Sequence, residues 1–209
     1  MRDLLLVRHG TTDWVDQQIL HGITDIPLNK KGEAQAEETA QALKNSGAQK
    51  IYTSSLTRCV QTAQAIGKEI GFKPILMDSL VEINFGWLEG KHYRDHDKGE
   101  YGKLVEFYDE RIHHLIRMLS GEPKRNLKKR VLIGWNSILA DNPKGTVIVV
   151  AHSGVFSSIL FHYFGKTFLN GDSYYHLNPC SITEIHINDS GQADLIRLSD
   201  HSHLSEENL

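Results

Sequence analysis

The sequence predicts an α/β fold, a three-layer α/β/α sandwich with a mostly parallel central sheet. Short apolar runs alternate with helix-like segments over most of the chain. Residues 146–151 are apolar at consecutive positions, which is typical of a central strand covered on both faces. The turn signal at residues 188–191 separates two strand-like runs and indicates an antiparallel hairpin at the sheet edge. Because 209 residues suffice for one core, we expect a single domain over residues 1–209.

Strands are predicted where a short apolar run ends at a turn or loop. These runs cover residues 3–7, 50–53, 146–151, 181–187 and 193–198, and a further apolar segment, 74–77, leads into 80–85. The first strand runs into Arg8, His9 and Gly10, and the central strand ends at His152. Ligands of such sheets bind beyond the carboxyl ends of the strands, so we expect these side chains to gather there.

Helices are predicted where apolar side chains recur at helical spacing. These segments cover residues 32–46, 59–70, 104–119, 127–138 and 155–164. Gly47 and Gly71 are expected to end the first two helices. Ser54 and Ser55 are candidate caps of the second helix, whose first turn contains Arg58.

Composition excludes several classes of protein. A net charge of −3 gives no global electrostatic reason to expect a nucleic-acid or membrane partner. Cys59 and Cys180 do not suggest a disulfide framework, which favours a reducing compartment. The apolar run 4–7 is too short for a signal peptide or a membrane span, so we expect a cytoplasmic protein. The sequence leaves its oligomeric state open between a monomer and a homodimer.

Two arginines and two histidines at the strand ends supply the parts that phosphoryl transfer needs. The planar fork of an arginine holds two phosphate oxygens, which makes Arg8 and Arg58 suitable clamps. The helix that begins near Arg58 adds a positive dipole end. A neutral imidazole is a competent nucleophile, so His9 is able to attack phosphorus without a metal.

Ordered motifs resemble those of the histidine phosphatase superfamily, whose type members are cofactor-dependent phosphoglycerate mutases. The RHG signature and four further motifs occupy residues 6–10, 21–36, 54–63, 82–90 and 151–155. The similarity covers nearly the whole chain but is weak over 91–145. It implies a phosphoglycerate mutase-like α/β/α fold.

The resemblance also implies a role for each matched residue. His9 becomes phosphohistidine; Arg8, Arg58 and His152 bind the phosphate; and Glu82 protonates the leaving group and then activates water. Four more positions are assigned to substrate binding: Thr11, His21, Gly22 and Ser153. Glu89 competes with Glu82 for the acid role, but its place in the motif favours support of the loop.

Two positions depart from the family pattern RHGETxWN. Thr11 stands where the family has Glu, and Val15 stands where it has Asn. Thr11 supplies a hydroxyl instead of a carboxylate, and an amide contact to phosphate is missing at Val15. These departures bear on phosphate affinity and on the assignment to a subfamily.

Other polar and aromatic clusters have simpler explanations. His92 and His96 have metal-compatible spacing on a helix, as His201 and His203 do on a strand, but neither pair has a third ligand nearby, so we expect no metal and no cofactor. The five cations in 124–130 favour a solvated helix start over recognition of a second anionic group. Two tryptophans flank the motifs as pocket walls or as core: Trp14 and Trp87.

Three functions follow from this pattern. The favoured one is a phosphomonoester hydrolase acting on a small phosphorylated metabolite, with residues 91–126 as a lid-like excursion that selects the substrate. Candidate contacts in the excursion are Tyr93, Arg94, His96 and Lys103. A phosphoglycerate mutase is the alternative, although mutases of the family carry a longer insertion there. A non-catalytic phospho-ligand-binding module is the third, and it is expected to lack His9, Arg58 or His152.

Overall fold

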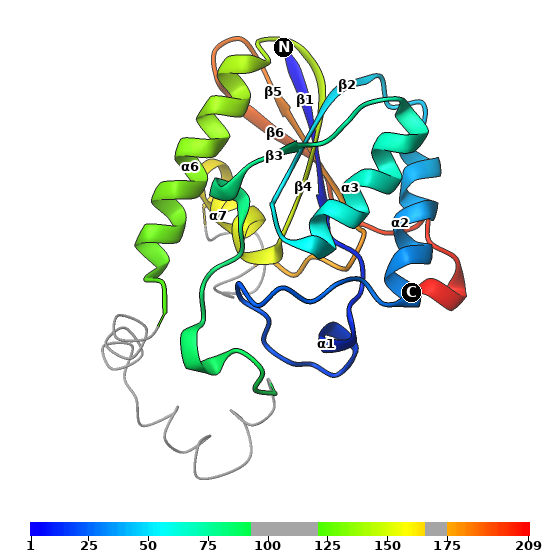
Figure 1. The fold of residues 1–209 in the computed structure, drawn as a ribbon. Helices are drawn as coiled ribbons and strands as arrows, with labels where there is room; N and C mark the ends of the chain where they lie inside the picture. Colours follow the sequence, from blue (N-terminus) through cyan, green and yellow to red (C-terminus); the bar gives the residue numbers. More distant parts are fainter. Residues whose placement is uncertain (93–120, 166–174) are drawn as a thin grey trace.

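The computed structural model describes residues 1–92, 121–165 and 175–209, and its centre is a six-stranded sheet in the order β3-β2-β4-β1-β5-β6 (Figure 1). Four strands are mutually parallel: β1 (Arg2–Arg8), β2 (Ala48–Thr53), β3 (Ile75–Leu76) and β4 (Gly145–Ala151). Two strands are antiparallel to these or to each other: β5 (Ile182–Ile187) and β6 (Ala193–Asp200). The predicted terminal hairpin is therefore confirmed.

Helices cover both faces of the sheet (Figure 1). One layer contains α2 (Lys30–Leu43) and α3 (Thr57–Ile70), and the other contains α6 (Lys124–Asp141) and α7 (Ser153–Phe164). Short helices lie in the connections: α1 (Asp13–Asp16), η1 (Asp78–Leu80), η2 (Gly86–Leu88) and η4 (Glu206–Asn208). The predicted three-layer α/β/α sandwich is confirmed.

Alternating side chains of the central strands feed the two layers of core. Leu4 and Leu6 of β1 belong to the hydrophobic cluster that contains α6 and α7, whereas Leu5 and Val7 belong to the cluster that contains α2 and α3. This alternation is the period of two that a strand imposes. Burial of each such side chain contributes roughly 1.5–3 kcal/mol, which explains why β1 and β4 are apolar at consecutive positions.

One helix boundary and one strand differ from the prediction. Helix α2 ends at Leu43, and Gly47, with φ +71°, lies in the turn that leads to β2 instead of capping the helix. Gly71 does cap α3, with φ +80° and its N–H bonded to the carbonyl of Gly67. Segment 74–77 forms only the two-residue edge strand β3, in which Ile75 and Leu76 are exposed.

The predicted serine caps of α3 are wrong. The residue before the helix is Leu56, which has no side-chain capping bond, and the carboxylate of Asp25 accepts from Thr57 N at 2.7 Å. Ser54 and Ser55 instead bond to groups outside the helix. A carboxylate from a distant loop thus replaces the local serine caps.

The excursion assigned to residues 91–126 ends earlier than expected, because α6 already begins at Lys124. The predicted helix 104–119 and the candidate contacts Tyr93, Arg94, His96 and Lys103 lie outside the residues that the structure describes. Among the helices it does describe, none is long and apolar enough to cross a membrane.

Candidate active site

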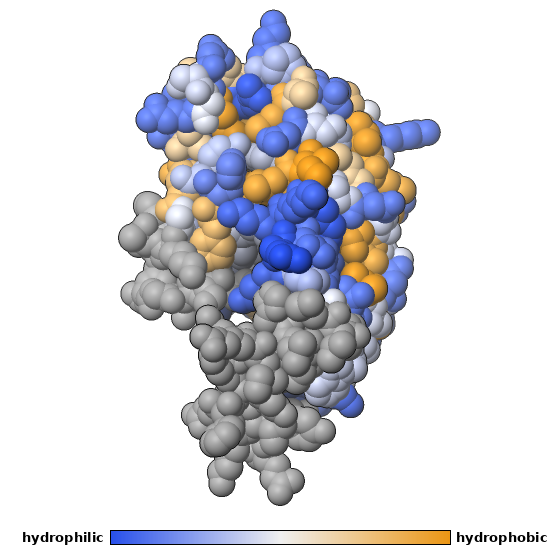
Figure 2. Space-filling view, turned by 90° about the vertical axis from the view of Figure 1, so that its left-hand side faces the viewer, coloured by the Kyte–Doolittle hydropathy of each residue, from blue (hydrophilic) through white to orange (hydrophobic). Residues whose placement is uncertain are grey.

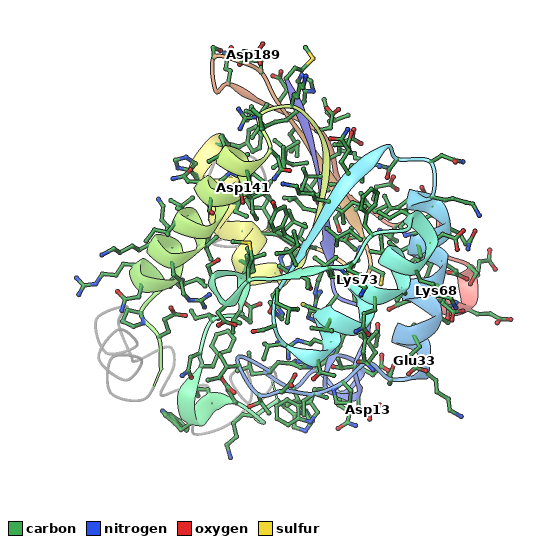
Figure 3. The ribbon with its side chains drawn as sticks, turned by 45° about the horizontal axis from the view of Figure 1, so that its top comes forward. Asp13, Glu33, Lys68, Lys73, Asp141 and Asp189 are labelled. Carbon is green, nitrogen blue, oxygen red and sulfur yellow. The ribbon has the colours of Figure 1, made fainter. Side chains whose placement is uncertain are left out.

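The site begins where three neighbouring parallel strands end. His9 follows β1, Ser54 follows β2 and His152 follows β4, and the N–H groups of His9 and Ser54 still bond to carbonyls of β4 at 3.0 Å each. In Figure 3, Asp13 marks this end of the molecule, and Asp189, in the β5–β6 turn, marks the opposite end. The sheet register therefore brings the two predicted histidines together.

His9 is held as a neutral imidazole with one defined tautomer. Its Nδ1 lies 2.8 Å from the carbonyl oxygen of Gly10, and because a carbonyl only accepts, Nδ1 carries the proton and Nε2 keeps its lone pair. Burial, followed by the charges of Arg58 and Arg8, holds the pKa of His9 well below its ordinary value. A buried imidazole with a free Nε2 lone pair is a suitable nucleophile.

His152 is fully buried, with its ring centroid 5.1 Å from that of His9. Its Nδ1 accepts from Nη2 of Arg58 at 3.3 Å, which leaves Nε2 to donate to the hydroxyl of Ser54 at 2.9 Å. Burial, then Arg58, lowers its pKa well below the ordinary value. Two neutral histidines thus share one site, and the positive charge there comes from the arginines.

Arg58 is a buried cation aimed at this site. It is 0% exposed, and its Nη1 and Nη2 donate to the carbonyls of Thr24 and Gly22 at 2.9 Å each. Its Nε has no hydrogen-bond partner among the parts of the chain that the structure covers. A buried guanidinium without a carboxylate partner in these contacts is suited to an anion. Arg8 lies at the end of β1, and its Nη1 donates to the carbonyl of Leu177 at 2.5 Å.

Glu82 reaches the site from the other side. Its Oε1 accepts from Ile83 N at 2.9 Å, and its Oε2 accepts from Gly154 N at 3.1 Å, in the first turn of α7. Burial raises its pKa above the ordinary value for a glutamate. A Cβ at position 154 would lie 2.4 Å from Oε1, so only glycine leaves room for this carboxyl. A carboxyl with a raised pKa is suited to general acid work.

Glu89 joins the two loops that flank the site. Its Oε1 accepts from Ile23 N and Phe85 N at 3.0 Å each, and its Oε2 accepts from Thr24 N at 2.9 Å and from the Thr24 hydroxyl. Gly22 has φ +54°, and a Cβ there would lie 1.9 Å from Oε1. Glu89 therefore supports the loop, as expected, and is fully occupied by donors of the protein.

Thr11 is fixed through its backbone. Its N–H donates to Oε1 of Gln35 at 2.8 Å, and Nε2 of Gln35 donates to the carbonyl of Asn208 at 2.7 Å. Gln35 thus links η4 to the loop after His9. Val15 is half-buried in α1, and its N–H donates to the hydroxyl of Thr12, which caps that helix.

Two further residues predicted to contact substrate, His21 and Ser153, both hydrogen-bond to groups of the protein. Nε2 of His21 lies 2.5 Å from the hydroxyl of Thr12, and burial together with the nearby arginines lowers the pKa of His21 to about 3. The ring of His21 is 6.3 Å from that of His9. The Ser153 hydroxyl donates to the carbonyl of Tyr175 at 3.4 Å, so in this structure the protein itself uses that donor.

Three supporting residues were missed by the reasoning from sequence. Ser54 bonds to His152, Gln35 bonds to Thr11, and the hydroxyl of Thr62 accepts from Gly10 N at 3.1 Å. All three lie inside the family motifs, in 21–36 and 54–63, and that location is the signal that could have identified them.

His92, His201 and His203 do not lie on the elements expected for them. His92 forms an isolated bridge with Ile19 and is not on a helix, while His96 lies outside the described ranges. His201 and His203 follow β6, because the chain turns at Asp200, whose carboxylate accepts from the N–H two residues later. Within residues 1–92, 121–165 and 175–209, no group of three or more potential ligands could hold a metal ion.

The two tryptophans and the five cations that the sequence singled out lie partly at the surface and partly in the interior. The Trp14 ring lies 5.5 Å from that of His21, whereas Trp87 is 46% exposed and therefore not part of the core. Figure 2, which faces α6, shows strongly hydrophilic surface beside the grey segments. Four cations at the start of α6 are exposed, Lys124, Arg125, Lys128 and Lys129, whereas Arg130 turns inward.

Known proteins share both the fold and the sequence pattern. A phosphatase named PhoE from Bacillus subtilis, described as uncharacterized, is 32% identical over 77% of this chain and 76% of its own length. A probable phosphoglycerate mutase, GpmB of Cronobacter sakazakii, is 30% identical over 88% of this chain and 85% of its own. The crystal structure of a phosphoserine phosphatase mutant from Entamoeba histolytica, in complex with phosphoserine, is 27% identical with a TM-score of 0.78, covering 98% of this chain and 100% of that one.

The family model described as histidine phosphatase superfamily (branch 1) matches residues 4–200, from β1 to the end of β6. That range contains every residue of the constellation around His9, together with all of the central sheet except the first two residues of β1. The chain belongs to the histidine phosphatase superfamily.

Proposed function

We propose that this protein hydrolyses phosphomonoesters through a phosphohistidine intermediate on His9. The observation that carries the proposal is the tautomer of His9. Its Nδ1–H donates a hydrogen bond to the Gly10 carbonyl, so the lone pair of Nε2 is left to attack phosphorus. The buried, cationic surroundings keep this imidazole neutral at pH values where phosphate esters are anionic. Relatives named as phosphatases support the proposal.

In the first step, Nε2 of His9 forms a bond to phosphorus, and the ester P–O bond breaks. The departing oxygen takes the proton of the Glu82 carboxyl, which burial keeps protonated above the ordinary range. Arg58 and Arg8 balance the charge on the phosphoryl oxygens. The products are an alcohol and a phosphorylated His9.

In the second step, water attacks the same phosphorus while the ionised Glu82 takes its proton. The P–N bond breaks, inorganic phosphate leaves, and His9 and Glu82 return to their starting protonation states. One carboxyl therefore serves as acid and then as base, as microscopic reversal of the first proton transfer requires.

The proposed substrate is a small phosphorylated metabolite, and the residues of the proposed chemistry are all supplied by this chain. A mutase is the second candidate, favoured by the similarity to the protein named GpmB. In that reaction a bound phosphorylated molecule, instead of water, would take the phosphoryl group from His9. Water would have to be excluded from the site.

The test is hydrolysis of p-nitrophenyl phosphate and of an alkyl phosphate in excess chelator, beside a His9→Ala variant. We expect chelator-resistant release of inorganic phosphate, a phosphoenzyme trapped by rapid alkaline quench, and loss of both in the variant. Activity that persists in His9→Ala would refute the mechanism. Interconversion of 2- and 3-phosphoglycerate without net release of phosphate would favour the mutase.

A further inference from the structure

Arg130 of α6 uses all its donors on the loop that carries Glu82 and on the carboxylate of Glu122. Nη1 donates to the carbonyls of Ser79 and Val81 at 3.1 and 2.5 Å, and Nη2 donates to the carbonyl of Glu82 at 2.8 Å. The remaining donors, Nε and the second Nη2 proton, bond to the two carboxylate oxygens of Glu122 at 2.8 Å each. Since arginine has five N–H donors, none is left for a substrate.

The loop is held on this side by packing as well as by hydrogen bonds. A cavity of about 530 Å³ borders it, lined by Val81 and Asn84 from the loop, by Ile23, and by Glu122 and Arg130. Packing of Leu80 and Ile83 into the hydrophobic cluster that contains α6 fixes the apolar side of the loop, and the hydrogen bonds of Arg130 fix its carbonyl groups beside the cavity. Asn84 adds a second connection, since its carbonyl accepts from Glu122 N at 2.7 Å.

Within the described part of the chain, two backbone N–H groups, those of Ile83 and Gly154, hold the carboxyl of Glu82 at the site. A shift of the Glu82 carbonyl would move the Cα and the carboxyl with it and break the bond to Gly154. The catalytic rate falls sharply when a catalytic acid is displaced by about 1 Å. The main chain at Glu82 must therefore be fixed from outside the loop, and Arg130 makes the direct contact.

We propose that Arg130, oriented by Glu122, is a positioning residue for Glu82 and so sets the efficiency of proton transfer to the leaving group. This inference rests on the proposed acid role of Glu82. The carboxylate of Glu122 holds the guanidinium plane, and the guanidinium then holds three carbonyl groups of the loop.

The first test is Arg130→Lys with two substrates. A lysine has three donors at one point and cannot bridge these carbonyls together. We expect kcat/KM for an alkyl phosphate to fall about 30-fold, and that for p-nitrophenyl phosphate to fall less than about threefold, because a good leaving group needs little proton assistance. Lys129→Met, an exposed neighbour in the same helix, is the matched control and should change neither value.

The second test is the pH profile, which a merely structural role would not move. Freed from its burial, the Glu82 carboxyl would return toward an ordinary pKa, so the alkaline limb of kcat/KM should shift to lower pH in Arg130→Lys. Glu122→Gln, which keeps the size of the partner, should shift it in the same direction by less. Circular dichroism and Tm establish that each variant is folded.

Equal losses for both substrates, or an unchanged alkaline limb in a folded variant, would overturn the positioning role. If Arg130→Lys does not fold, the same two readouts on Glu122→Gln decide. An inactive native protein would instead count against the proposed function, so the two failures are distinguishable.

Discussion

The proposed phosphate cradle and the loop that carries the proposed acid, here called the acid loop, lie at the same site but are held in different ways. The cradle, formed by Arg8, His9, Arg58 and His152, starts at the ends of β1 and β4 and at the first turn of α3. The acid loop, residues 78–90, lies beyond the edge strand β3 and contains only short 3-10 turns. Sheet register positions the cradle, whereas side chains from distant segments position the loop.

This difference determines where substitutions act. A change in the cradle removes a charge or a nucleophile, so it affects every substrate. A change in the acid loop, or in the residues that hold it, moves one proton donor and affects substrates according to their leaving group. The comparison can therefore be tested by the ratio of the activity on an alkyl phosphate to the activity on an aryl phosphate, rather than by either activity alone.

The largest effect is expected for Arg58→Lys in the cradle. Lysine retains the charge but loses the fork that bonds to Gly22 and Thr24, so kcat/KM should fall about 10²–10³-fold for alkyl and aryl phosphates alike. Steady-state kinetics with both substrates measure this, and exposed Arg125→Lys is the control. A loss confined to alkyl phosphates would break the division between the two regions.

Glu82→Gln should have a large effect on one substrate class only. Glutamine cannot donate or regain the proton as a carboxyl does, so alkyl phosphate hydrolysis should fall about 10²-fold while formation of the phosphoenzyme from an aryl phosphate persists. Burst kinetics with p-nitrophenyl phosphate separate the two steps. Equal damage to both ester classes would remove Glu82 from the acid role.

Gly154→Ala should give a weaker form of the same pattern. The added methyl group would sit 2.4 Å from Glu82 Oε1 and force the carboxyl aside, so we expect a loss of about tenfold for alkyl phosphates. In a Glu82→Gln background the alanine should cost much less, because there the residue it displaces no longer transfers a proton. A double-mutant cycle measures this coupling, and simple additivity would contradict it.

The smallest effect is a displaced pH optimum. Activity should rise with pH as His9 loses its proton, and the lowered pKa of His9 puts that limb below the ordinary histidine value of about 6.5. Activity should fall as Glu82 loses its proton, and its raised pKa puts that limb above about 4.3. A kcat/KM profile from mildly acidic to neutral pH checks both, and Glu82→Gln should lack the alkaline limb.

The cradle could be predicted from sequence because its residues are adjacent to strand ends. The apolar runs identify β1 and β4, and the polar residues that follow them, His9 and His152, must then lie at one edge of a parallel sheet. Residues 54–63 carry Arg58 in a recognisable local motif. The expected three-layer fold follows from the same alternation.

The support of the acid loop could not be predicted in this way. Arg130 belongs to a run of cations that sequence alone favours as solvated, and Glu122 belongs to a segment expected to form an excursion. The position of Arg130 in the helix could have indicated that its side chain turns inward. Arg130 lies three residues after buried Leu127 and next to buried Val131, on the inward side of α6. The Asp25 cap of α3 was missed because its partner is far away in sequence.

The contact from Gln35 to both Thr11 and Asn208 has a practical consequence for handling the protein. A fusion or surface attachment at residue 209 would begin next to Asn208. The carbonyl of Asn208 is connected to the loop after His9 through the side chain of Gln35. An attachment at Met1 would begin beside Asp189, at the far end of the sheet. Purification tags and immobilisation chemistry therefore belong at the amino terminus, where the tether leaves the catalytic loop undisturbed.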